Sequence, residues 1–135
     1  MVGILLMTHA PLGQAFIAAC THVFRAPIER LEAIDVTPDQ DLTEVQAMAE
    51  AAIKRLDAGF GVLIITDIKG GTPANCCDRL ADAGRVEVIA GISLPMLLRA
   101  ITYRRDNLDV VVEMALAGAQ SGAVRVDNRI RVGEN

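Results

Sequence analysis

The run Gly3-Ile4-Leu5-Leu6-Met7-Thr8-His9 decides the fold that this sequence predicts. Apolar residues follow Gly3 without interruption, and the run ends in a threonine and a histidine. Pro11 and Gly13, directly downstream, oppose any continuation as a strand. The pattern therefore predicts a buried first strand that carries His9 at its carboxyl end. In open α/β sheets, ligands and chemistry gather at the carboxyl ends of the strands, where the strand order reverses.

A second stretch, Val62-Leu63-Ile64-Ile65-Thr66-Asp67, repeats this design and predicts a central strand that ends in a carboxylate. If the strand order is 2-1-3-4, the first and third strands are neighbours, and His9 and Asp67 open into one crevice. We interpret them as a nucleophile and its orienting carboxylate. Each residue alone has a simpler reading, because a lone histidine is usually structural and an aspartate can cap a helix.

Strands and helices alternate along the rest of the chain. This alternation predicts a three-layer, doubly wound, mostly parallel α/β sheet of order 2-1-3-4, with a short antiparallel last strand. Thr72 and Ser93 are the expected N-caps of the helices that follow the third and fourth strands. The expected further strands are 31–36, 86–90 and 124–126, and the expected helices are 13–25, 42–57, 72–83, 94–106 and 108–120.

The bulk composition fits one domain, residues 1–135, with an aliphatic core. Hydrophobic residues make up 52% of the chain and aromatic residues only 3%. The net charge of -4 disfavours non-specific nucleic-acid binding. No apolar run approaches the roughly 20 residues that cross a bilayer, and Met1 to Met7 lacks the basic residues of a signal peptide. We expect a cytoplasmic protein without membrane insertion.

The sequence indicates no metal and no cofactor. The three cysteines are odd in number and two are adjacent, so we expect buried or reduced thiols rather than disulfides. The two histidines lack a metal-ligand spacing. Neither a P-loop nor a dinucleotide fingerprint is present. The segment Gly91-Ile92-Ser93-Leu94-Pro95 is similar to a hydrolase nucleophile elbow but lacks its final glycine, which leaves a serine hydrolase as a weaker alternative.

The Gly70-Gly71 step precedes an expected helix and suits an anion. Consecutive N–H groups and the helix dipole there could hold a phosphoryl group, although an ordinary tight turn has the same sequence. A neutral imidazole offers one bare nitrogen as a nucleophile, and a carboxylate on the other nitrogen fixes the tautomer. Asp67 should therefore face the ring nitrogen opposite the phosphoryl group. Donors to the phosphoryl oxygens are expected from Thr8, Gly71, Thr72 and Ser93.

Three segments together resemble the IIA components of the mannose-type branch of the sugar phosphotransferase system. The resemblance extends over nearly the whole length of the chain. It implies a phosphorylatable histidine, matched by His9, a nearby aspartate, matched by Asp67, and a last antiparallel strand exchanged in a homodimer. The segments are Thr8-His9, Asp67 with Gly70-Gly71-Thr72-Pro73-Ala74-Asn75, and Ala90-Gly91-Ile92-Ser93-Leu94-Pro95-Met96-Leu97.

The resemblance also implies a function, that of a phosphotransferase component taking part in sugar transport. His9 would accept a phosphoryl group from the phospho-histidine carrier protein and pass it to a IIB component. A related branch phosphorylates dihydroxyacetone and is one alternative. Another is a regulatory module whose phosphorylation state is read by a binding partner. The sequence names no sugar.

The end of the chain predicts assembly into a homodimer. Val124-Arg125-Val126-Asp127 is too short and too polar for a stable free edge strand. Pairing with the sheet of a partner subunit would satisfy its backbone groups, and exchange of identical elements is a low-cost route to a symmetric dimer. We expect a homodimer that depends on the segment after Gly122.

Overall fold

The computed structural model describes residues 1–127, which form four strands and five helices. The four expected strands at 3–9, 31–36, 62–66 and 86–90 are confirmed. The elements are β1 (Gly3–His9), α1 (Leu12–Phe24), β2 (Leu31–Val36), α2 (Leu42–Leu56), β3 (Val62–Thr66), α3 (Thr72–Cys77), β4 (Val86–Ala90), α4 (Leu94–Tyr103) and α5 (Leu108–Gly122).

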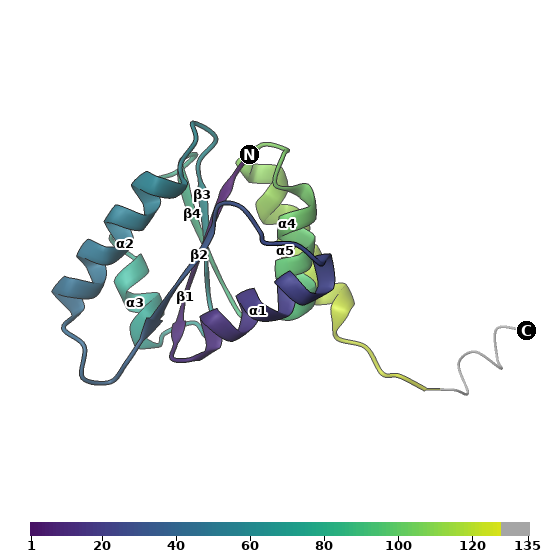
Figure 1. Cartoon of the computed structure of the whole chain (residues 1–135), viewed down its shortest axis with the longest axis horizontal. Helices are drawn as coiled ribbons and strands as arrows, with labels where there is room; N and C mark the ends of the chain where they lie inside the picture. The colour runs from purple at the N-terminus through teal and green to yellow at the C-terminus, as the bar shows by residue number, and fades with distance from the viewer. Residues whose placement is uncertain (128–135) are drawn as a thin grey trace, which may run out of the picture.

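The four strands form one parallel sheet of order β2-β1-β3-β4, as the sequence predicts (Figure 1). The two strands with the most continuous apolar runs, β1 and β3, lie in the middle and are buried along their length. In the register, Met7 pairs with Thr66, and Thr8 pairs with Asp35. The carboxyl ends of β2, β1 and β3 therefore meet at one edge of the sheet.

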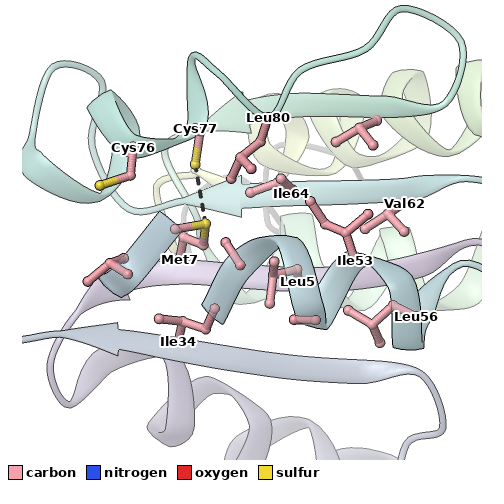
Figure 2. Packing of buried hydrophobic residues seen from close by; sticks show 14 of the residues in the cluster. Leu5, Met7, Ile34, Ile53, Leu56, Val62, Ile64, Cys76, Cys77 and Leu80 are labelled. Carbon is pink, nitrogen blue, oxygen red and sulfur yellow. Dashed lines mark hydrogen bonds between the residues drawn. The ribbon is translucent and has the colours of Figure 1, made fainter. Parts of the chain in front are cut away.

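Helices cover both faces of the sheet and complete the three layers (Figure 1). α2 and α3 lie on one face, and α1, α4 and α5 lie on the other. Successive residues of β1 and β3 alternate between the two buried clusters, as a strand with both faces covered must. Figure 2 shows the cluster under α2 and α3, built from aliphatic side chains with Met7, Cys76 and Cys77.

The cysteines are free and buried, which confirms the expectation from their number and spacing. The Cys77 thiol lies 3.5 Å from the sulfur of Met7 and 3.2 Å from the carbonyl oxygen of Pro73. Burial, together with the nearby Cys76 and Asp78, raises the pKa of the Cys77 thiol to about 12. This thiol therefore stays protonated and acts as a packing group.

Side-chain caps begin three of the helices. Asp41 accepts a hydrogen bond from the N–H of Thr43 at α2, Ser93 caps α4, and Asn107 caps α5. The Ser93 hydroxyl accepts from the N–H of Met96, so the cap predicted there is confirmed. Each cap satisfies a backbone donor that the first helical turn leaves without an intrahelical partner.

The helix after β3 differs from the prediction. α3 ends at Cys77 rather than near residue 83, and its N-cap is Gly71 rather than Thr72, with no side-chain cap. Asn75 donates its N–H to the carbonyl of Gly71, which sets the first helical turn one residue earlier. Beyond α3, Asp82 exchanges backbone hydrogen bonds with Val86, and this turn draws the chain out of the helical path.

The end of α5 packs closely on the start of α4. A Cβ added at Gly122 would lie 2.4 Å from the Cβ of Pro95, so only glycine fits there. Beyond this contact the chain leaves the body of the molecule (Figure 1). Val124 to Asp127 form no strand within this chain, so the expected antiparallel last strand is not part of the described sheet. The rest of that segment lies outside the described residues.

Candidate functional site

His9 is the last residue of β1 and leaves the sheet at its carboxyl edge. Its side chain is 49% exposed, whereas the preceding residues of the strand are buried. The chain after it is fixed at once, because Ala10 donates its N–H to the carbonyl of Val36 in β2 at 3.0 Å. The imidazole is thus presented to solvent from a rigid element.

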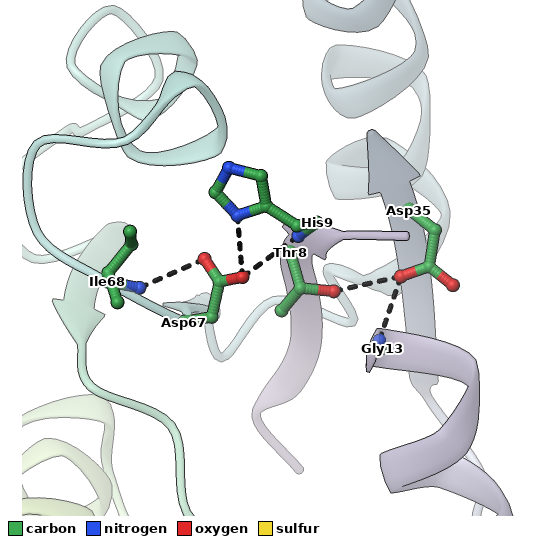
Figure 3. A network of polar contacts seen from close by, with 6 residues as sticks. All are labelled: Thr8, His9, Gly13, Asp35, Asp67 and Ile68. Atoms are coloured by element: carbon green, nitrogen blue, oxygen red, sulfur yellow. Dashed lines mark hydrogen bonds and ion pairs between the residues drawn. The ribbon is translucent and has the colours of Figure 1, made fainter. Parts of the chain in front are cut away.

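Asp67 lies directly beside His9, as the strand order predicts (Figure 3). Its Oδ2 lies 2.8 Å from Nδ1 of the imidazole and accepts the backbone N–H of His9 at 2.9 Å. Its Oδ1 accepts the N–H of Ile68 at 2.9 Å. The carboxylate is only 10% exposed. Both oxygens are therefore occupied, and the side chain has a single orientation.

The hydrogen bonds favour the charged form of Asp67. Burial raises the pKa of its carboxyl, but hydrogen bonds from the backbone and ring of His9 and from the N–H of Ile68 outweigh burial and hold the pKa below its usual value. Asp67 is an anion at neutral pH and can only accept hydrogen bonds. The proton of a neutral His9 is consequently held on Nδ1, and Nε2 carries the free lone pair.

Gly71 and Thr72 also lie near the imidazole. A Cβ added at Gly71 would lie 3.1 Å from Cε1 of His9, so the backbone at the start of α3 approaches the imidazole closely because this residue is glycine. Thr72 is exposed and borders the same opening as His9. The structure therefore brings these two predicted residues to the histidine.

A depression of about 550 Å³ lies next to His9, between β1 and the loop from β2 to α2. Its walls combine apolar side chains with the imidazole at one side, which gives the exposed ring a shallow and mainly hydrophobic surrounding. Its remaining lining residues are Ala10, Val36, Thr37, Pro38, Gln40, Leu42 and Thr72.

The other two predicted donors have other partners. Thr8 is fully buried, and its hydroxyl donates to Oδ1 of Asp35 at 2.8 Å, on the side of β1 away from Asp67 (Figure 3). The Ser93 hydroxyl accepts the N–H of Met96 at the start of α4, after a strand that β3 separates from β1. Within residues 1–127, no hydrogen bond joins either hydroxyl to His9 or Asp67.

Asp35 is a residue of this site that the sequence interpretation missed. It is the penultimate residue of β2, opposite Thr8, and accepts the N–H groups of Gly13 at 2.8 Å and Gln14 at 3.2 Å. The signal that could have found it is the register of the sheet. An aspartate one residue before the end of β2 lies beside the residue before His9 when the two strands end together.

Within residues 1–127, no group of three or more histidine, cysteine, aspartate or glutamate side chains is placed to hold a metal ion. In the same part of the chain, no helix has both the length and the apolar character needed to span a membrane.

Comparison with known proteins identifies the family. The model of the EIIA-man family, described as PTS system fructose IIA component, matches residues 3–116. The mannose-specific EIIAB component of the phosphotransferase system from Escherichia coli is 33% identical over 92 residues, covering 66% of this chain. That match spans only 28% of the length of the Escherichia coli protein.

Solved structures share the fold over almost the whole chain. Component EIIA of the phosphotransferase system from Streptococcus agalactiae aligns with a TM-score of 0.82 at 20% identity, over 93% of this chain and 97% of that one. The mannose/sorbose-specific IIA subunit from Enterococcus faecalis aligns with a TM-score of 0.80 at 25% identity, over 93% and 95% of the two chains. With the family model matching residues 3–116, the chain belongs to the EIIA-man family of phosphotransferase-system IIA components.

Proposed function

We propose that this protein is a phosphocarrier that accepts a phosphoryl group on Nε2 of His9 and passes it on. The observation that carries the proposal is the 2.8 Å contact between Nδ1 of His9 and the buried Asp67 carboxylate. The carboxylate holds the proton on Nδ1 and leaves Nε2 as an outward-facing nucleophile. It also stabilises the positive charge that the ring gains when Nε2 is phosphorylated.

The donor is a phosphorylated histidine-carrier protein, and the acceptor is a IIB component. In the first step the P–N bond of the donor breaks as a P–N bond forms at Nε2 of His9. The donor imidazole leaves with its own electron pair, and the Nδ1 proton of His9 stays hydrogen-bonded to Asp67. The second step repeats this exchange toward the acceptor. Such transfers depend mainly on positioning and charge stabilisation, which the fixed imidazole and its carboxylate supply.

Gly71 and Thr72 are the first candidates to contact the phosphoryl oxygens, because both lie beside the imidazole. Thr8 and Ser93 are weaker candidates through their hydroxyls. The Thr8 hydroxyl donates its proton to Asp35 and would have to exchange that partner before reaching a phosphoryl oxygen. The Ser93 hydroxyl accepts the N–H of Met96 and keeps its proton, but it follows β4, which β3 separates from β1. The depression next to His9 is wide enough to receive side chains of a docking protein.

The homodimer is part of the same proposal. β4 pairs with no strand other than β3 in the described sheet, and beyond the bridge from Val86 to Asp82 its other edge is open. The chain leaves α5 beside Pro95, close to the point where β4 ends. A segment following Gly122 from a partner subunit could add to this edge as an antiparallel strand and cover its backbone groups.

The test of the function uses the two histidines of the chain as a matched pair. The protein is incubated with phosphoenolpyruvate and the general phosphotransferase carrier proteins, and the modified residue is mapped by mass spectrometry at alkaline pH. We expect one phosphoryl group on His9, lost in His9→Ala and retained in His22→Ala, since His22 lies on the exposed side of α1. Addition of a IIB component should then discharge the label. Label on His22, or label that survives in His9→Ala, refutes the proposal.

A further inference from the structure

One carboxylate, that of Asp35, joins the chain on both sides of His9. Its Oδ1 accepts the hydroxyl of Thr8, the residue before the histidine, at 2.8 Å. The same oxygen accepts the N–H of Gly13 in the first turn of α1 (Figure 3). Oδ2 accepts the N–H of Gln14 in the same turn. His9 lies between Thr8 and Gly13, so the contacts of Asp35 connect the two ends of the short segment that contains the imidazole.

Among residues 1–127, the first turn of α1 has no other side-chain cap. Its N-cap residue is Pro11, which makes no side-chain hydrogen bond to the helix. The N–H groups of Gly13 and Gln14, which the first turn leaves unpaired, instead donate to Asp35 from the neighbouring strand. A negative charge at this place also interacts favourably with the helix dipole. Removal of the carboxylate therefore breaks the hydrogen bonds that fix the start of α1, and with them a restraint on the backbone between His9 and α1.

The imidazole depends on this backbone for its orientation. It is half exposed, and its close neighbours are Asp67 and the backbone of Gly71. The N–H groups of His9 and Ala10 are held by Asp67 and Val36. The contacts of Asp35 with Thr8 and the first turn of α1 add a further restraint on this backbone, which keeps Nδ1 opposite the carboxylate. Misplacement of a reacting group by about 1 Å can cost a hundredfold in rate.

We propose that Asp35 is a positioning residue for His9: by tying Thr8 to the first turn of α1, it holds the imidazole with Nδ1 against Asp67 and Nε2 outward. The inference rests on the proposed phosphoryl transfer for its kinetic effect. Its effect on the imidazole does not require that transfer. Asp67 acts on the ring directly, whereas Asp35 acts through the backbone.

The same chain contains a matched control for a purely stabilising helix cap. Asn107 caps α5 by accepting the N–H of Val110 at 3.1 Å, as Asp35 does for α1. Asn107 borders a depression with Gly59, Gly61 and Gly84, beside the amino ends of β3 and β4 and away from His9. Asn107→Ala should therefore lower stability as any lost cap does and leave the imidazole unchanged.

The experiment compares Asp35→Ala, Asp35→Asn and Asn107→Ala in the full chain with two readouts. Long-range proton–nitrogen NMR reports which ring nitrogen of His9 carries the proton. Rates of His9 phosphorylation, with phosphoenolpyruvate and the general carrier proteins as the donor system, give kcat and KM separately. In Asp35→Ala we expect a mixture of tautomers and a kcat lowered roughly ten- to a hundredfold, with KM changed much less. Asp35→Asn retains one acceptor oxygen and should lie between Asp35→Ala and the wild type.

Thr8→Val is the second variant should Asp35→Ala fail to fold. It removes only the tie on the amino side of His9 and should shift the tautomers in the same direction, by less. A folded Asp35→Ala with the wild-type NMR signature and kcat overturns the proposal. Equal losses of kcat in Asp35→Ala and Asn107→Ala overturn it as well. If the wild type takes no phosphoryl group but Asp35→Ala still shifts the tautomers, the positioning role stands and the proposed function fails.

Discussion

Gly13→Ala tests the network around His9 by steric means alone. A Cβ at this position would lie 2.7 Å from Oδ1 of Asp35, 2.8 Å from the hydroxyl of Thr8 and 2.9 Å from the Cβ of Ala33. All three distances are shorter than real Cβ contacts. The neighbours belong to β1 and β2 and are held by the sheet, so they cannot move away without breaking the hydrogen bonds of Asp35.

The expected cost follows from three contributions. Overpacking of this kind costs about 1–3 kcal/mol, and weakening a hydrogen bond to a charged group costs about 1.5–3 kcal/mol. Alanine is favoured over glycine in a helix by about 1 kcal/mol, which offsets part of the loss. We expect a net decrease of about 3 kcal/mol in the free energy of unfolding, and a slower phosphorylation of His9.

Urea denaturation followed by circular dichroism measures this change. Gln14→Ala is the control, because it lies at the next position of α1 with an exposed side chain, and only its backbone N–H contacts Asp35. Its free energy of unfolding should stay within about 0.5 kcal/mol of the wild type. If Gly13→Ala is as stable as the wild type, or more stable, the gain in helix propensity exceeds the steric and hydrogen-bond costs. The contacts around Asp35 would then be loose.

Three further results are expected. Asp67→Asn should slow phosphorylation of His9 without changing the circular dichroism. Because the pKa of Asp67 is lower in the folded than in the unfolded chain, its contribution to stability is present at neutral pH and is lost as the pH falls through the folded pKa. The unfolding free energy of the variant should therefore decline less on acidification than that of the wild type, and an unchanged acid profile would contradict this. Thr66→Val removes a buried hydroxyl that has no partner among the described residues and should raise the unfolding free energy, measured by urea denaturation, by about 1 kcal/mol. A lower unfolding free energy would show that the hydroxyl has a hydrogen-bond partner. A chain truncated after Ser121 should be monomeric by light scattering while the full chain is dimeric; a monomeric full chain, or an equally stable truncated dimer, would refute strand exchange.

The sheet and the pair at its centre could be predicted from the sequence because their signals are local. An unbroken apolar run ending in a polar residue marks β1 and β3, and each places one functional side chain at its end. The strand order then brings His9 and Asp67 together. Nothing beyond the two runs and a parallel arrangement is needed for this part of the site.

The parts that the sequence did not reveal depend on contacts between distant segments. Asp35 lies 22 residues from Gly13, and its role as the cap of α1 exists only once β2 lies beside β1. The end of α3 is set by backbone hydrogen bonds between Asp82 and Val86, which leave no mark in helix propensity. From the sequence alone the Thr8 hydroxyl is expected to be a free donor, because its acceptor, Asp35, lies on the neighbouring strand β2.

The separation of His9 from Asp67 along the chain has a consequence for synthesis. The two residues are 58 positions apart, and β3 reaches β1 only after β2 and α2 have been made. During translation the histidine thus emerges well before its orienting carboxylate. Domains fold largely as units while the chain grows. A ribosome-bound or prematurely terminated chain that lacks β3 would carry the histidine without its orienting carboxylate. We therefore expect such a chain to be a poor acceptor in the phosphoryl transfer proposed above.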